Sequence, residues 1–218
     1  MTTTLPLSST PRSTPTRLRE RARSDREDLY AVLDAGLICH VGLVRDGVPV
    51  VLPTGYGRIG DTLYVHGSTG AGWLRMLDGT PVCVTVTHVD GIVYARSVFH
   101  HSMNYRSAVV HSVARLVTDE DEWWDAVRAV VEHLAPGSWT HARTPTRREA
   151  AATAVFAVDL AEAAVKVRNG PPVDEDEDVA EGGRWAGVLP VHTTFGEPQP
   201  AADLVPAVPT PTHVGSRD

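Results

Sequence analysis

Short apolar runs separated by tight turns follow one another along the first half of the chain. The run 37–44 is apolar and β-branched, Arg45–Gly47 follows as a turn, and the apolar pattern returns over 48–59. Gly60–Asp61 marks a second tight turn, after which 62–67 has the pattern of a third strand. Strands joined by such short turns predict an antiparallel meander rather than alternating strands and helices.

The second half of the chain continues this strand pattern. Residues 81–89 and 92–99 predict a second hairpin, because Asp90–Gly91 supplies a turn between them. A further strand is predicted over 108–117, and the strands predicted over 154–160 and 163–168 complete the sheet. Six or seven strands with two or three short helices predict a closed or nearly closed antiparallel barrel, since closure removes exposed strand edges.

Three segments predict helices. Ser24 and Glu27 have the spacing of a capping box, which predicts a short helix over about 25–34. The segment 68–79 interrupts the strand pattern and predicts a second short helix. Residues 119–134 begin with acidic side chains and carry apolar ones at helical spacing, including two tryptophans expected to pack the helix.

The ends of the chain differ in composition from its middle. Residues 1–23 are rich in Thr, Ser and Pro without a hydrophobic period, which predicts a disordered arm. The barrel is predicted to span 24–170. Residues 171–192 combine an acidic linker with the apolar motif RWAGVLPV, which is expected to dock on the barrel, and 193–218 form a Pro-rich mobile tail.

Charge and cysteine content exclude several classes of protein. The formal net charge of −7 argues against general nucleic-acid binding, which depends on clustered Lys and Arg. Cys39 and Cys83 lie in apolar runs, which predicts two buried thiols in a reducing compartment. No apolar run approaches the roughly 18 residues of a membrane span, and the first residues lack the apolar core of a secretory signal. We therefore expect a cytoplasmic protein that binds neither nucleic acid nor membrane.

The segment Gly55–Gly60 matches the letters of the dinucleotide-binding fingerprint GxGxxG. That fingerprint works only between a strand and a helix, because the pyrophosphate must meet the N-terminus of the helix. Here a turn and another strand follow. The sequence therefore does not predict a Rossmann site.

Two other segments carry groups that suit a phosphate. The Gly-rich bend 66–72 enters a predicted helix, so its free N–H groups and hydroxyls face the positive end of the helix dipole. The segment 102–107 offers the Arg106 guanidinium, the Ser107 hydroxyl and the Asn104 amide. On chemistry alone an ordinary turn explains the first segment equally well, and a solvated connector explains the second better.

The ten histidines do not form a recognisable metal motif. His100 and His101 are adjacent, so on a strand they would point to opposite faces and could not readily share one metal ion. His88 and His111 lie in apolar strands and are equally consistent with satisfied core residues. The chain has no HExxH, paired CxxC or GxSxG spacing, so we predict neither a metal site nor a serine hydrolase.

Four motifs occur in a fixed order over about residues 24–191: LPTGYGRIGDTLYVHGSTGAG, SVFHHSMNYRSAVVHSVARLV, AVKVRNGPP and WAGVLPV. In this order they resemble the FMN-binding split-barrel superfamily. The resemblance is closer to its pyridoxamine 5′-phosphate oxidase-related branch, which includes nitroimidazole-resistance-like proteins. It implies a mainly β fold with short helices, a six-stranded antiparallel split barrel, and a homodimer with FMN bound at the interface.

The resemblance also implies which residues bind the cofactor. Those at 53–56 would lie along the flavin ring or ribityl chain, those at 104–107 would hold the phosphate and ribityl oxygens, and Trp185 would cover the isoalloxazine. The implied set is Pro53, Thr54, Tyr56, His66, Ser68, Arg75, Asn104, Tyr105, Arg106, Ser107 and Trp185.

The activity implied by the resemblance is that of an FMN-dependent oxidoreductase. It would pass electrons from a reduced nicotinamide to a small organic acceptor such as a nitroaromatic. His66 is the expected catalytic residue, because an imidazole beside the reactive ring can deliver a proton. The Arg/Lys-rich phosphate motif of true pyridoxamine-phosphate oxidases is not evident, because the predicted helix after His66 carries Arg75 as its only basic residue. Pyridoxamine phosphate is therefore not the expected substrate.

A second hypothesis assigns the same fold a different cofactor. Split barrels also carry a deazaflavin or a haem, and such a protein need not turn over rapidly. The haem-ligand candidates are His88, His100, His101 and His111.

Overall fold

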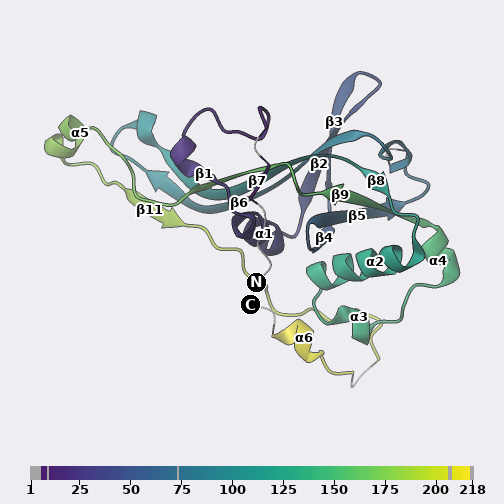
Figure 1. The fold of residues 1–218 in the computed structure, drawn as a ribbon. Coiled ribbons are helices and arrows are strands. Elements are labelled where there is room, and N and C mark those ends of the chain that lie inside the picture. Colours follow the sequence, from purple (N-terminus) through teal and green to yellow (C-terminus); the bar gives the residue numbers. More distant parts are fainter. Residues whose placement is uncertain (1–5, 9, 73, 206–207, 217–218) are drawn as a thin grey trace.

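The computed structural model describes residues 6–8, 10–72, 74–205 and 208–216, and two antiparallel sheets dominate it (Figure 1). The larger sheet has the strand order β1-β10-β7-β6-β2-β3, with β11 pairing to β6, and the smaller has the order β4-β5-β9-β8. The strands of the larger sheet are β1 (Ala22–Arg23), β2 (Cys39–Arg45), β3 (Val48–Thr54), β6 (Pro81–Tyr94), β7 (Ser102–Val113), β10 (Ala163–Arg168) and β11 (Gly187–Pro190). Those of the smaller sheet are β4 (Tyr56–Ile59), β5 (Thr62–Ser68), β8 (Arg115–Leu116) and β9 (Thr153–Asp159).

The helices are short apart from one. They are η1 (Arg19–Arg21), α1 (Arg26–Ala35), η2 (Leu74–Met76), η3 (Val98–His100), α2 (Glu120–Leu134), α3 (Ser138–His141), α4 (Arg147–Ala151), α5 (Asp176–Glu181) and α6 (Thr212–Gly215). Within the part of the chain that the structure describes, no helix is long and apolar enough to cross a membrane.

The main core lies between the two sheets and is closed at one end by α1. Alternate residues of β6, including Val84 and Val86, point inward, and Leu63 on β5 meets them from the smaller sheet. Leu29 and Leu33 of α1 pack into the same cluster and are fully buried. Each such side chain contributes about 1.5–3 kcal/mol on burial, so this cluster supplies most of the stability of the barrel.

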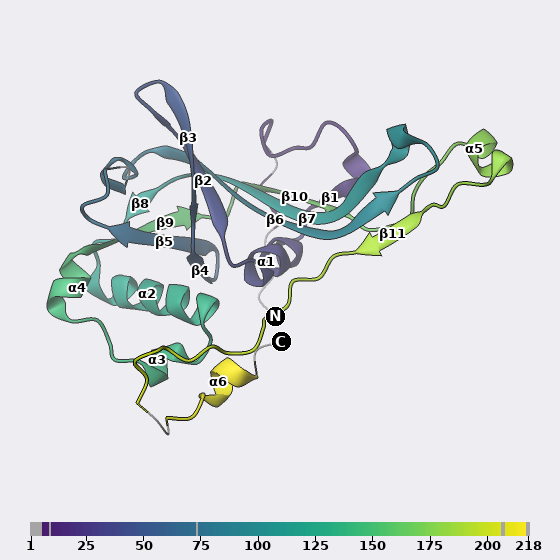
Figure 2. The ribbon, with the colours of Figure 1, turned by 180° about the vertical axis from the view of Figure 1, so that it is seen from behind.

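Helix α2 covers the other side of the smaller sheet (Figure 2). Ala126 and Val130 of α2 are buried against Tyr64 and Val155, which belong to β5 and β9. The helix approaches β4 so closely that a Cβ placed on Gly57 would lie 2.4–2.6 Å from three backbone atoms of α2. Only glycine allows this contact between helix and sheet.

The C-terminal end of α1 is capped by side chains from three other elements. The Tyr56 hydroxyl donates to the Leu33 carbonyl oxygen, His88 Nε2 lies 2.9 Å from the Val32 carbonyl oxygen, and His133 Nε2 lies 2.5 Å from the Gly36 carbonyl oxygen. The last carbonyls of a helix lack partners within the helix. Side chains from β4, β6 and α2 therefore supply hydrogen-bond partners for the carbonyl oxygens at this end of α1.

Strands β6 and β7 form a long hairpin that extends beyond the barrel, and the segment 171–190 folds back along it (Figure 1). Asp174 accepts hydrogen bonds from the Arg96 backbone N–H at 2.7 Å and from its guanidinium at 2.8 Å, and its side chain is almost fully buried. β11 then pairs with the end of β6. The apolar motif near the C-terminus thus docks on the far end of this hairpin.

The N-terminal arm, predicted as disordered over 1–23, makes defined contacts where the structure describes it. Arg12 forms a double hydrogen bond with Glu162, with both N–O distances at 2.7 Å. The Leu7 N–H donates to the Ser24 carbonyl oxygen, and β1 pairs with β10. Glu162 lies just before β10, so these contacts hold the arm along the edge of the larger sheet.

Several local predictions need correction. The capping box at Ser24–Glu27 does not form, because Asp25 occupies the cap position and makes no side-chain cap bond. A capping box is found instead at Thr146 and Glu149. The helix predicted within 68–79 is reduced, in the described residues, to the single turn η2. The helices predicted over 25–34 and 119–134 are confirmed as α1 and α2.

Candidate functional site

The predicted residues on β7 divide between its two faces. The pairing register places Tyr105 and Ser107 on the outer side of the larger sheet, whereas Asn104 and Arg106 share the side of the buried Ala108. A clamp formed by all four side chains around one phosphate is therefore not present in a single chain.

Asn104 and Arg106 already have partners within the protein. The Asn104 amide donates to the Gly170 carbonyl oxygen at 3.2 Å, and its oxygen accepts from the Gly170 N–H and the Arg168 guanidinium. Arg106 forms two hydrogen bonds to Asp90, at 3.0 and 2.9 Å, and thereby holds the pKa of that carboxyl below its usual range. These two residues fix the end of β7 and β10 and the bulge of β6.

A polar row crosses the outer side of the larger sheet and includes residues that the sequence analysis did not single out. Thr87 of β6, Ser107 of β7 and Lys166 of β10 are directly paired across three neighbouring strands. Thr85 lies two residues earlier on the same face of β6. We call Thr85, Thr87, Tyr105, Ser107 and Lys166 the outer face. Hydroxyls beside an ammonium group suit a phosphate or a polyhydroxyl chain.

Of the predicted cofactor residues Pro53, Thr54 and Tyr56, only Pro53 lies on the side of the outer face. Pro53 pairs with His40, which in turn pairs with Thr85, so Pro53 lies on the same row. Thr54 pairs with the buried Cys39 on the opposite side. Tyr56 is fully buried, its hydroxyl is used by α1, and burial raises its pKa. Tyr56 is therefore a structural residue in this chain.

His66 and Ser68 lie on the smaller sheet, away from Ser107. His66 shares the side of Tyr64, which packs against α2, and it pairs with the buried Val155. Its Nδ1 is buried without a hydrogen-bond partner among the described residues, and burial lowers its pKa, which favours the neutral imidazole. The Ser68 hydroxyl accepts from the Gly70 N–H at 3.2 Å. The side chain of Arg75 lies outside the described residues.

Trp185 lies at the far end of the long hairpin, with its ring 5.8 Å from that of Tyr94. Tyr94 also contacts His101, whose Nδ1 lies 3.1 Å from the Ser97 carbonyl oxygen. We call this end of the hairpin the hairpin tip. Its exposed apolar side chains include Val98 at 89%, Phe99 at 85% and Trp185 at 70% exposure.

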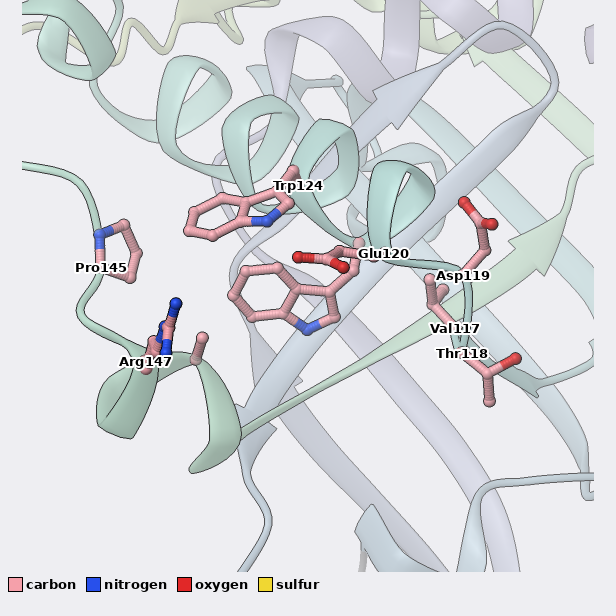
Figure 3. Close-up of a pocket in the computed structure, with 9 residues that line it drawn as sticks. Val117, Thr118, Asp119, Glu120, Trp124, Pro145 and Arg147 are labelled. Atoms are coloured by element: carbon pink, nitrogen blue, oxygen red, sulfur yellow. The ribbon is translucent and has the colours of Figure 1, made fainter.

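A cavity of about 530 Å³ between α2 and α4 contains none of the predicted cofactor residues. Trp124 and Glu120 approach it from α2, while Pro145 approaches from the segment before α4 and Arg147 from the first turn of α4 (Figure 3). Trp123 is held there by a hydrogen bond from its indole N–H to the Thr153 carbonyl oxygen at 3.3 Å.

Comparison with known proteins gives a consistent picture. The family model described as "Pyridoxamine 5′-phosphate oxidase" matches residues 25–167. The structure of the flavocytochrome Anf3 from Azotobacter vinelandii is 38% identical and covers 98% of this chain and 99% of its own, with a TM-score of 0.91. That of the FAD and heme binding protein from Mycobacterium smegmatis is 41% identical and covers 89% and 95%, with a TM-score of 0.85. The search of curated proteins gives no match.

A more distant structure shows the same fold. A candidate 5-nitroimidazole antibiotic resistance protein from Bacteroides thetaiotaomicron is 22% identical, covers 67% of this chain and 86% of its own, and has a TM-score of 0.57. With the two structures above, this likeness confirms the predicted antiparallel split barrel with short helices. The sheet does not close completely, since β3 and β1 end the strand path of the larger sheet.

Proposed function

This chain belongs to the pyridoxamine 5′-phosphate oxidase family, and from that premise we propose that it is a redox protein that binds both a flavin and a haem. The observation that carries this proposal is made at the hairpin tip. There the exposed His101, whose Nδ1 is hydrogen-bonded to the Ser97 carbonyl oxygen, lies beside an exposed apolar surface. The two relatives of 38% and 41% identity, a flavocytochrome and a FAD and heme binding protein, support the same pair of cofactors.

His101 has the surroundings of an axial haem ligand. A ligating histidine usually donates its second ring N–H to a carbonyl, which fixes the ring and leaves the other nitrogen for the metal. His101 Nδ1 lies 3.1 Å from the Ser97 carbonyl oxygen, and Nε2 has no hydrogen-bond partner among the described residues. Haem needs only one or two such ligands from the protein. The exposed Phe99 and Trp185 offer an apolar surface for the porphyrin.

The other histidine candidates have more restrictive surroundings. His88 Nε2 lies 2.9 Å from the Val32 carbonyl oxygen under α1, and His100 Nε2 lies 3.3 Å from a Glu175 carboxylate oxygen. His111 is half-buried and pairs with Cys83 within the larger sheet. Each of these rings is therefore less suited to meet a porphyrin from outside the protein.

The outer face fits a flavin nucleotide. Thr85, Thr87 and Ser107 offer hydroxyls for a ribityl chain, and Lys166 offers a cation for a phosphate. FAD is the proposed flavin in place of FMN, because the relative at 41% identity is named for FAD. A bound flavin supplies hydride acceptance and single-electron release, and haem supplies single-electron exchange. The protein would pass electrons from a reduced nicotinamide to a small organic acceptor.

The absorption spectrum of the purified protein tests this proposal. We expect both flavin bands and a Soret band, release of FAD rather than FMN on denaturation, and bleaching of the flavin bands after anaerobic addition of NADH or NADPH. If the protein stays colourless after incubation with FAD and hemin, the proposed function is wrong.

A second copy of the chain is the proposed partner, with the flavin at the interface. Val44 and Val51 lie on the same side of the larger sheet as the outer face and are both 63% exposed. Covering them would remove apolar surface from water. We expect Val51→Asp to convert a dimer into a monomer in sedimentation measurements. Val48→Asp, on the opposite side of the same hairpin, is the matched control and should leave the dimer intact. A wild-type monomer would contradict this proposal.

A further inference from the structure

A cavity of about 270 Å³ lies between the N-terminal arm and the edge of the larger sheet. One wall is formed by Leu7, Ser8 and residues 13–15 of the arm, and the other by residues 22–24 and 163–165. Hydroxyl groups of the arm and of Ser24 line it, together with Arg23. We call this space the arm cavity.

The arm cavity is held together by specific contacts. The Leu7 N–H donates to the Ser24 carbonyl oxygen at 3.0 Å, and the Ser8 N–H donates to the Ala161 carbonyl oxygen at 2.9 Å. The two Arg12–Glu162 hydrogen bonds anchor the arm on the other side. The contacts of Ser8 with Ala161 and of Arg12 with Glu162 join residues about 150 positions apart in the sequence, so the cavity is a product of the folded chain rather than of a local turn.

Arg23 lines the arm cavity, and further cations lie next to its walls in the sequence. The short stretches 17–23 and 166–168 contain six of them and a single carboxylate, Glu20, in a protein whose formal net charge is −7. They are Arg17, Arg19, Arg21, Arg23, Lys166 and Arg168. Among the described residues, the ion pair between Glu20 and Arg21 is long, at 3.8 Å. Positive charge is thus concentrated where the rest of the protein does not neutralise it.

A side-chain contact joins the two cationic stretches. The Lys166 ammonium group donates to the Arg17 carbonyl oxygen at 3.1 Å, and Arg23 donates to the carbonyl oxygens of Glu20 and Ala22. Burial and the nearby Arg21 both lower the pKa of Arg168. Bringing like charges together costs free energy, which an anionic ligand would recover.

The arm cavity lies next to the strand position that carries Lys166 of the outer face, because Ala22 and Val165 line it. Lys166 pairs with Ser107 on the outer face and with Ala22, which lines the arm cavity. The cavity is slightly smaller than the roughly 300–1,000 Å³ of sites that enclose whole ligands, so it suits one part of a longer molecule. Hydroxyls and guanidinium groups are the donors that phosphates prefer.

We propose that the arm cavity and its cations bind the diphosphate and adenylate part of FAD, and so select FAD over FMN. This inference rests on the proposed function for the flavin itself, whose ring would lie on the outer face. The N-terminal arm, which carries four of the six cations, is then part of the cofactor site rather than a disordered extension.

Binding measurements on the full chain, freed of bound cofactor, test the inference. The double variant Arg21→Gln/Arg23→Gln removes two charges without shortening the side chains greatly. Loss of one charge-assisted hydrogen bond weakens binding by about tenfold or more. We therefore expect FAD affinity to fall at least tenfold while FMN affinity stays within about twofold. Arg128→Gln, at an exposed position of α2, is the matched control and should change neither.

ADP serves as a second probe, because it carries a diphosphate and an adenosine but no flavin. We expect it to bind the wild-type chain, to compete with FAD but not with FMN, and to bind the double variant at least tenfold more weakly. This measurement separates the two proposals: if no flavin binds, the proposed function fails, and ADP binding still decides the role of the cavity.

Three outcomes would overturn the inference. If the double variant weakens FAD and FMN equally, the cations hold the phosphate that both flavins share. If it weakens neither, the cations do not contact the cofactor. If ADP binds without displacing FAD, the cavity is a site for a free nucleotide.

Discussion

Replacing His101 by alanine is expected to abolish the Soret band of the haem-loaded protein while leaving its flavin bands in place. Changes in the outer shell of a metal site already weaken metal binding by about 10–100-fold, so loss of the ligand itself should exceed that range. His101 is exposed, and its one hydrogen bond joins it to Ser97 four residues away. The substitution should therefore leave the melting temperature of the haem-free protein almost unchanged.

His100→Ala is the matched control for this prediction, because it removes the same group from the neighbouring residue. His100 faces the Glu175 carboxylate and packs against Phe99. We expect His100→Ala to keep the Soret band at nearly full intensity after titration with hemin. If His100→Ala loses the Soret band and His101→Ala retains it, the haem ligand is His100, and the assignment of His101 is wrong.

Replacing Gly57 by alanine is expected to destabilise the fold strongly. The new Cβ would lie 2.4 Å from the Ala129 carbonyl carbon and 2.5 Å from the Val130 nitrogen, and neither backbone atom can move without shifting α2. Overpacking of this kind costs about 3 kcal/mol or more, which lowers the melting temperature of a chain of this size by roughly 6–12 °C. Thermal unfolding followed by circular dichroism measures the change.

Gly55→Ala supplies the comparison for Gly57→Ala. A Cβ on Gly55 would meet the end of the Leu134 side chain at 2.8 Å, and this flexible group can rotate away. Alanine also reduces the entropy of the unfolded chain, which offsets about 0.4–1 kcal/mol. We expect Gly55→Ala to change the melting temperature by only a few degrees. Equal losses for both variants would show that the backbone of α2 is not what restricts position 57.

Local patterns predicted the elements of the fold that depend on local interactions. The acidic start and helical spacing of α2 are visible in the sequence, as are the turns that join β2 to β3 and β4 to β5. Asp46 and Gly47 both adopt a positive φ in the first of these turns, as Gly60 does in the second. Such signals lie within a few residues of the structure that they determine.

The arrangement of the site could not be predicted in the same way, because it depends on distant partners. Arg106 has the chemistry of a phosphate ligand, but Asp90 on the neighbouring strand occupies it. Lys166 is the only lysine in the chain, yet its place beside Ser107 follows from a strand register that no local pattern reveals. Arg12 and Glu162, which also contact each other, lie even further apart in the sequence. The resemblance pointed to segments of the chain and could not say which way each side chain faces.

The capping of α1 by Tyr56, His88 and His133 has a consequence for how the molecule opens. The three residues belong to β4, β6 and α2, so these side-chain hydrogen bonds to the end of α1 persist only while both sheets and α2 are assembled. We therefore expect that α1 does not unfold locally while the rest of the protein stays folded. Its amide hydrogens should therefore exchange with solvent as slowly as those of the central strands, and α1, although only ten residues long, belongs to the last unit to unfold.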